Sequence, residues 1–192
     1  ISMAAAAFQL RNEGRPTSSL HQLPGPPLKP FLFDVASDAS DAARMALFAT
    51  HTADALAHVQ DTFHGMSLHN RVAIIVPDDS FRAGLSGPLA AHLEKQHQHA
   101  ERPYALLGAA AACALIGERA ADEVLLLDAV DQFDGLERLI VIAVGLDADL
   151  SAGGAIGSAA LEARSRLYRA LTRAHMLVLV VDEARPNGML TF

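Results

Sequence analysis

Several residue types are scarce in this chain, and each shortage excludes a class of protein. The 192 residues include no Trp, two Tyr and one Cys, Cys113. A single Cys excludes an internal disulfide framework and a Cys-rich zinc site, and it fits a reducing compartment. The only lysines are Lys29 and Lys95, and neither follows a Gly. The G-x-x-x-x-G-K-[ST] loop that cradles nucleotide phosphates is therefore absent, and we expect no ATP hydrolysis by the usual route from this chain by itself.

Long apolar runs and excess positive charge are also missing. No stretch approaches the roughly 20 apolar residues that a membrane-spanning helix needs. The first residues lack the basic and apolar regions of a secretory signal, so we expect no membrane contact and an intracellular location, nuclear or cytoplasmic. The formal net charge of −7 argues against a protein that coats nucleic acid with a uniformly basic surface, but it leaves room for a local groove.

Composition predicts one domain with short flanking segments. Hydrophobic residues make up 51% of the chain, which is enough to bury a core. Residues 16–30 contain five prolines, which remove backbone donors and favour an extended connector. We therefore divide the chain into an N-terminal segment (1–15), a Pro-rich connector (16–30), a folded domain (31–185) and a tail (186–192).

Strand-like and helix-like patterns alternate along the domain. Apolar runs without polar alternation predict strands buried on both faces, and apolar residues at three- and four-residue steps predict helices. Ser37-Asp38 is expected to open the first helix, Asp78-Asp79-Ser80 the second. The alternation predicts an α/β fold, a parallel sheet covered by helices on both faces. Expected strands are 30–35, 71–77, 104–108, 124–127, 139–144 and 176–181, and expected helices are 37–65, 80–98, 109–120 and 159–174.

Two segments in the last third of the chain carry the most specific patterns. Residues 124–147 read VLLLDAVDQFDGLERLIVIAVGLD, which predicts a buried strand, a tight Asp-Gly turn and a second buried strand. Residues 162–175 read EARSRLYRALTRAH, which predicts a helix that ends at Thr172-Arg173-Ala174.

Together these segments resemble the last two motifs of UvrD/Rep-type superfamily 1 helicases. The resemblance covers nearly all of residues 8–183 and implies a RecA-like (P-loop NTPase-type) domain, the second of the helicase, without its own P-loop. The spacing leaves no room for the large helical insertion of UvrD and Rep, which implies a compact relative similar to Schlafen-type or DUF2075-type proteins. It also implies that ATP and magnesium bind mainly on the missing first RecA-like domain of the same parent protein.

The first motif in that family reads Thr-x-His-x-x-Lys-Gly-Leu-Glu, and the Gly-Leu-Glu part is intact here. The resemblance implies that Gly135 and Glu137 contact the nucleotide, with Glu137 near its sugar, and that Gln132 touches nucleic acid. Ala129, Asp131 and Asp134 replace the Thr, His and Lys. Because two carboxylates repel phosphate, we expect DNA or RNA binding by this chain to be weak.

The second motif supplies the candidate catalytic arginine. The resemblance implies that Arg173 reaches the γ-phosphate across a domain cleft, where a charged planar donor stabilises developing charge, and that Thr172 beside it also contacts the nucleotide. Arg166 and Arg169 share its helical face and are candidates for nucleic-acid contact. Near the N-terminus, FQLRN resembles a further family motif and makes Arg11 a second phosphate-sensing candidate.

Simpler interpretations stay open beside these. Arg173 also suits the end of a helix as a cation that interacts with the dipole, and Arg166 and Arg169 suit a solvated face. The nine histidines show no H-E-x-x-H pattern, so we predict no metal site. The alternative function is a degenerate helicase-like domain that acts as a non-catalytic protein-interaction or regulatory module. A stand-alone small-ligand enzyme is disfavoured because no nucleophile and base occur together at a strand end.

Overall fold

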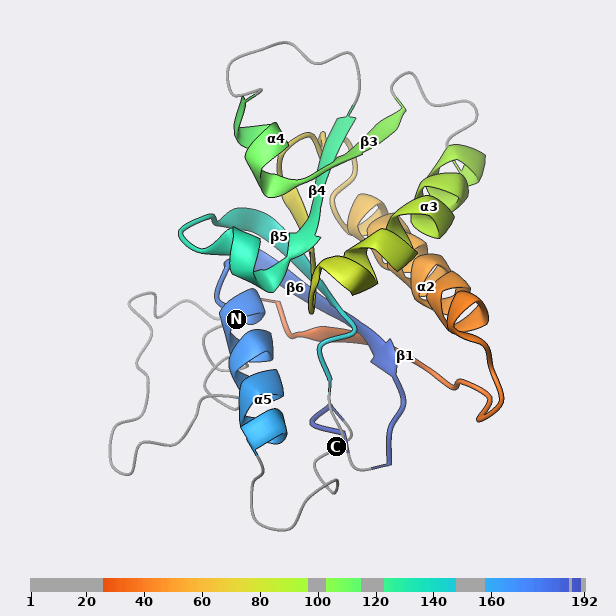
Figure 1. Ribbon diagram of the computed structural model, residues 1–192. Coiled ribbons are helices and arrows are strands. Elements are labelled where there is room, and N and C mark those ends of the chain that lie inside the picture. The colour runs from red at the N-terminus through yellow and green to blue at the C-terminus, as the bar shows by residue number, and fades with distance from the viewer. Residues whose placement is uncertain (1–25, 97–102, 115–122, 148–157, 187, 191–192) are drawn as a thin grey trace, which may run out of the picture.

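The structure is a computed structural model that describes residues 26–96, 103–114, 123–147, 158–186 and 188–190. Strands and helical segments alternate along these residues, as the sequence predicts (Figure 1). In chain order they are β1 (Lys29–Phe33), α2 (Asp41–Thr62), β2 (Val72–Val76), α3 (Asp79–Gln96), β3 (Tyr104–Leu107), α4 (Ala109–Ala114), β4 (Glu123–Ala129), the 3₁₀ helix η1 (Val130–Phe133), β5 (Arg138–Val144), α5 (Ser158–Leu171) and β6 (Ala174–Glu183).

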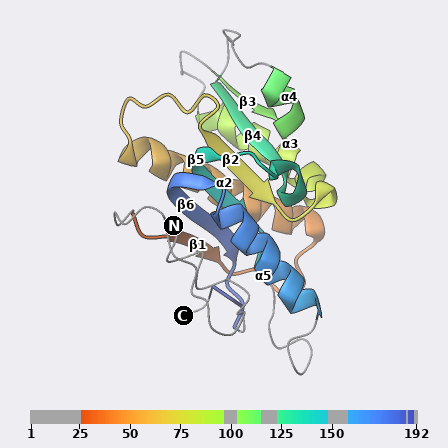
Figure 2. The same ribbon diagram turned by 90° about the vertical axis from the view of Figure 1, so that its left-hand side faces the viewer.

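The sheet has six strands in the order β1-β6-β5-β2-β4-β3, and all neighbouring pairs are parallel. Helices α2 and α3 cover one face, whereas α4, η1 and α5 cover the other (Figures 1 and 2). The predicted α/β fold, with a parallel sheet between two helical layers, is confirmed.

The central strands are apolar throughout because both of their faces are buried. All five residues of β2 are buried, and Ile74 joins the core under α2 and α3. Its neighbour Ile75 joins the core under α4, η1 and α5, as the two-residue period of a strand requires. On α2, Ala49, Leu56 and Val59 lie in the first of these cores, as the helical spacing of apolar residues in this segment predicts.

The first helix starts later than Ser37-Asp38, so this part of the prediction is wrong. The Ala39 N–H donates to the Ala36 carbonyl at 3.0 Å, so Ser37 and Asp38 occupy a turn before the helix. Ser and Asp favour turns as well as helix starts, which makes the two hard to distinguish in sequence. The N-cap is Ser40, whose hydroxyl oxygen accepts the Ala43 N–H at 3.2 Å.

Two other predicted local features are confirmed. Asp78 caps α3, because its Oδ1 accepts the Phe81 N–H at 2.9 Å. The Asp-Gly turn before β5 is closed by the Leu136 N–H, which donates to the Phe133 carbonyl at 3.0 Å. Gly135 has a φ of +79°, a backbone conformation that favours glycine at the third position of a type II turn.

The ends of the domain extend past the predicted limits. β1 begins at Lys29, inside the predicted connector, and Met189 and Leu190 of the predicted tail are buried in the core beneath α5. No helix among the described residues is long and apolar enough to cross a membrane.

Candidate functional site

The two motifs of the last third meet at the amino ends of β5 and β6. Arg138 opens β5, Ala174 opens β6, and the two residues are partners in register. The Arg138 N–H donates to the Arg173 carbonyl oxygen at 2.9 Å. Helix α5 and η1 pack on the same face of the sheet, so the Gly-Leu-Glu turn and the Thr-Arg-Ala segment are neighbours (Figure 2).

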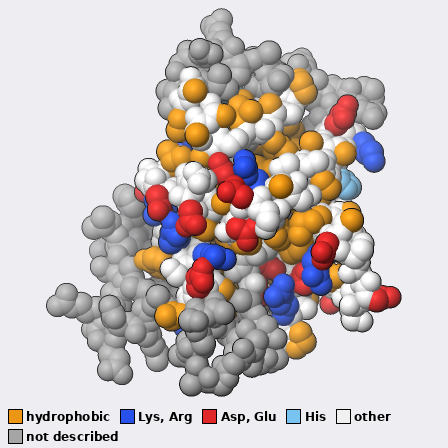
Figure 3. Space-filling view, viewed as in Figure 1, with side chains coloured by type: hydrophobic (Ala, Val, Ile, Leu, Met, Phe, Trp, Pro, Cys, Tyr) orange, Lys and Arg blue, Asp and Glu red, His pale blue; other side chains and the backbone are white. Residues whose placement is uncertain are grey.

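Arg169 joins the two motifs through side chains. Its Nη1 donates to Asp131 Oδ1 at 2.7 Å, and its Nη2 donates to Asp134 Oδ1 at 2.8 Å. The guanidinium fork therefore spans two carboxylates, one on η1 and one in the turn that follows. Figure 3 shows the resulting mixture of acidic and basic side chains over this part of the surface.

This cluster is exposed and electrostatically coupled. The hydrogen bond from Arg169 lowers the pKa of Asp134, and the hydrogen bonds to Asp134 and Asp131 raise the pKa of Arg169. Both carboxylate side chains are 69% exposed, so solvent and salt screen the pairs. Both acids are therefore paired with Arg169, and they compete with any external phosphate for its guanidinium.

Thr172 and Arg173 both serve the end of α5. The Thr172 hydroxyl donates to the Arg169 carbonyl oxygen at 2.9 Å, and Arg173 Nε approaches the same oxygen at 3.4 Å. These contacts satisfy a helix-terminal carbonyl, as the simpler interpretation of Arg173 expects. Within the described part of the chain, the two terminal nitrogens of Arg173 make no hydrogen bond, and the charge of Arg173 adds to the lowering of the Asp134 pKa by Arg169.

Glu137 directly precedes β5 and has a local partner. Its Oε2 lies 2.8 Å from His175 Nε2, and this contact is an ion pair when the imidazole is protonated. Glu137 is 52% exposed, so its carboxylate can exchange this partner for another at low energetic cost. Gly135 contributes its turn conformation and no side chain.

The remaining candidate residues differ in whether their side chains have a hydrogen-bond partner. Arg166 Nη2 donates to Glu162 Oε1 at 2.5 Å, one helical turn away. Gln132 is exposed on η1. Arg164, which the sequence did not single out, has an Nε that is buried without a hydrogen-bond partner among the described residues. Arg11 lies outside the described residues.

The carboxyl ends of the strands hold buried acids that the sequence analysis missed. Asp128, Asp147 and Asp182 follow the apolar runs of β4, β5 and β6 and are 6%, 7% and 0% exposed. Asp128 Oδ2 accepts the Ala109 N–H at 2.8 Å, and Arg82 Nε lies 3.6 Å from its Oδ1. The sequence indicates such acids by an Asp at the end of a buried apolar strand. A carboxylate in that position needs backbone donors or a cation.

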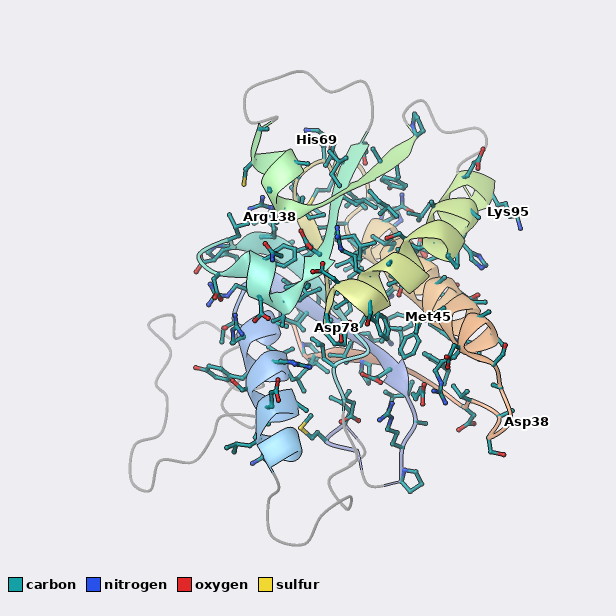
Figure 4. All side chains as sticks on the ribbon, in the orientation of Figure 1. Asp38, Met45, His69, Asp78, Lys95 and Arg138 are labelled. Carbon is teal, nitrogen blue, oxygen red and sulfur yellow. The ribbon has the colours of Figure 1, made fainter. Side chains whose placement is uncertain are left out.

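Asp78 occupies the same edge, at the start of α3 (Figure 4). The Ser80 hydroxyl and the Phe81 N–H donate to this carboxylate and lower its pKa, and Arg166 adds to the shift. Among the described residues, no group of three or more His, Cys, Asp or Glu side chains is placed to hold a metal ion.

Comparison with known proteins reveals a remote likeness to a solved structure. No protein-family model and no curated protein match the sequence. The chain is similar to a solved structure described as the C-terminal domain of a possible DNA helicase from Lactobacillus plantarum WCFS1, with 20% identity and a TM-score of 0.49. The match covers 84% of this chain and 78% of that chain. A likeness this remote assigns no function, so the residues of the two motifs have to carry the functional proposal.

Proposed function

We propose that this chain is the second RecA-like domain of a UvrD-like superfamily 1 helicase or ATPase. In this role it supplies Arg173 to ATP held mainly by a first RecA-like domain of the same parent protein. Domain closure on ATP then moves nucleic acid along the cleft between the two domains. The observation that carries the proposal is the meeting of the Gly-Leu-Glu turn and the Thr-Arg-Ala segment, joined by the 2.9 Å hydrogen bond from Arg138 to Arg173.

The described residues fit part of an ATP site. The terminal nitrogens of Arg173 suit a phosphate, and the exposed Glu137 suits a sugar hydroxyl. Both lie at the amino edge of the sheet, whereas open α/β sheets usually bind ligands at the carboxyl edge. This position favours contact with a nucleotide held by another domain. The described residues offer no cluster for magnesium, which the first domain is then expected to hold.

The test uses the longest natural protein that contains this chain. If a P-loop followed by an acidic magnesium-binding motif precedes the chain in frame, ATP turnover of that protein is measured with Arg173→Ala. Loss of turnover by about 10³-fold or more, with an unchanged melting temperature, supports the proposal. Arg71→Ala is the control, because Arg71 is exposed just before β2 at the same edge of the sheet.

Three outcomes contradict this assignment. Unchanged turnover in Arg173→Ala overturns the role of Arg173, and loss in Arg164→Ala alone transfers the role to the arginine whose Nε lacks a partner among the described residues. An upstream region without a P-loop overturns the motor proposal as a whole.

The alternative function is a non-catalytic interaction or regulatory module. The ion pairs of Arg169 with Asp131 and Asp134 favour it, because they neutralise the arginine that would otherwise face nucleic acid. Binding of single-stranded oligonucleotides at low salt separates the two functions. Salt-sensitive binding of the parent protein supports a helicase, and its absence supports an interaction module.

A further inference from the structure

Two buried carboxylates share one site at the carboxyl ends of β5 and β6. Asp182 Oδ2 accepts the Asp147 N–H at 2.7 Å, and Asp182 Oδ1 accepts the Glu183 N–H at 2.9 Å. Asp147 is 7% exposed and Asp182 is 0% exposed. Two acids in one buried site cannot both ionise without a large desolvation penalty.

Asp147 in turn holds the chain segment 188–190. Its Oδ1 accepts the Met189 N–H at 2.7 Å, and its Oδ2 lies 3.4 Å from the Leu190 nitrogen. Met189 and Leu190 are 7% and 2% exposed and pack in the core beneath α5. A Cβ at position 188 would collide with Asp147 Oδ2, so only glycine lets the backbone pass this close. The segment therefore packs directly against the Asp147 carboxylate.

The other charged groups around the pair are largely matched to one another. Glu183 lies 2.8 Å from Arg44 of α2 and 3.4 Å from Arg185. Burial raises the pKa of Asp182 to about 7, and the charge of Asp147 adds to the shift, although backbone donors and Arg185 oppose it. Asp182 therefore gains or loses a proton near neutral pH.

We propose that Asp147 and Asp182 form a proton-controlled latch for the segment 188–190. The latch is closed while Asp182 carries a proton, and it opens as that proton is lost, because opening admits water to the ionised Asp182 carboxylate. The latch is independent of the proposed helicase function, since it lies at the opposite edge of the sheet from Arg173.

The test is amide hydrogen exchange of the full chain, followed by NMR between pH 5 and 8 and corrected for the intrinsic exchange rate. The closed state binds the proton with a pKa of about 7, whereas an unperturbed Asp has a value of 3.8. The opening equilibrium at Met189 and Leu190 is therefore expected to rise by up to about tenfold per pH unit below pH 7 and to level off above it. In Asp182→Asn, which keeps the shape but cannot ionise, this pH dependence is expected to disappear.

Further variants and a core reporter separate the latch from other effects. Asp128→Asn removes another buried carboxylate that accepts backbone N–H groups, and it is expected to keep the pH dependence at Met189. Gly188→Ala is expected to open the segment at every pH. A pH-independent opening in the native chain overturns the proposal. An opening equilibrium at Met189 no larger than the one at Ile142, in the centre of the sheet, also overturns the proposal, because the segment then opens only by global unfolding. This comparison uses the native chain alone.

Discussion

Arg169 and Asp134 connect the last helix to the turn before β5 through an ion pair of 2.8 Å. Asp131 binds the second branch of the same guanidinium at 2.7 Å. In the sequence these acids stand where a helicase-like motif has His and Lys, and they were expected to repel phosphate. The structure adds a second effect, because the acids also occupy Arg169, the predicted candidate for nucleic-acid contact.

Replacement of Asp134 by Lys weakens both effects, because only Asp131 then remains to repel phosphate and to bind Arg169. Asp134→Lys is expected to tighten binding of a single-stranded oligonucleotide and to steepen the slope of log K against log salt by about 1 to 2, since it adds one phosphate contact and partly releases Arg169. Fluorescence anisotropy at several salt concentrations measures the slope. Asp38→Lys is the matched control, because it makes the same charge change at an exposed turn before α2 (Figure 4). Equal effects in the two variants would assign the result to net charge.

The start of α2 predicts a contrast between two serines. Ser40→Ala is expected to lower the free energy of unfolding by about 1 kcal/mol, because the Ala43 N–H loses its 3.2 Å acceptor. Ser37→Ala is expected to change it by less than about 0.5 kcal/mol, since Ser37 precedes the helix. Urea denaturation measures both values. A larger loss in Ser37→Ala would place the helix start at the residue that the sequence pattern favoured.

Gly145, which follows β5, is expected to tolerate no side chain. Its φ is +67°, and a Cβ there would lie 2.5 Å from Cζ of Phe81. The Phe81 ring packs edge-on against Phe48, with centroids 5.0 Å apart, so it has little room to move. Backbone strain and overpacking together predict a loss of about 2–4 kcal/mol in Gly145→Ala.

Gly65, in the turn after α2, is the control for that substitution. Its φ is +77°, and apart from its chain neighbours a Cβ added there would meet no atom within 4 Å, so Gly65→Ala is expected to lower the free energy of unfolding by only about 1–2 kcal/mol, from backbone strain alone. Chemical denaturation of both variants gives the comparison. Equal losses at the two positions would contradict the packing described for Phe81.

The buried acid Asp182 predicts how stability depends on pH. Its pKa rises from 3.8 to about 7 on folding, so the folded chain binds the proton more tightly than the unfolded chain. This contribution to stability is fully present below about pH 4 and is lost as pH rises to 7, with an upper limit of about 4 kcal/mol. Asp78 and Asp134, whose pKa values are lowered, act in the opposite direction.

A comparison with Asp182→Asn isolates this contribution from the other acids. The difference in unfolding free energy between the variant and the native chain is expected to move in favour of the variant as pH rises from 5 to 8. Urea denaturation at several pH values measures it. A difference that stays constant over this range would show that Asp182 is already ionised in the folded chain at pH 5.

Most of the fold was predictable because it depends on local patterns. Apolar runs such as Val72–Val76 indicate strands buried on both faces, and the spacing of Ala49, Leu56 and Val59 indicates the buried face of α2. The helix start at Ser40 was not predictable in the same way. Ser37, Asp38 and Ser40 all suit a cap, and the choice depends on which backbone N–H groups each can reach.

The candidate site was predictable in its residues but less so in its contacts. The motifs around Glu137 and Arg173 were recognised separately, and nothing in their spacing says that β5 and β6 bring them together at the amino edge. The roles of Arg11, Arg173 and the nucleic-acid candidates remain predictions. The sequence gives only a weak indication that Asp182 is important, because the pattern there is simply an acid at the end of an apolar strand.

The sequence by itself determined the alternation of strands and helices, the buried faces, the Asp-Gly turn and the absence of a P-loop, because each depends on neighbouring residues. Only the tertiary structure decided that Asp131 and Asp134 share Arg169, that Arg138 binds the backbone of Arg173, and that Asp147 holds the segment 188–190. These contacts join residues that are remote in the chain, and their charges and hydrogen bonds take effect only when the parallel sheet places them side by side.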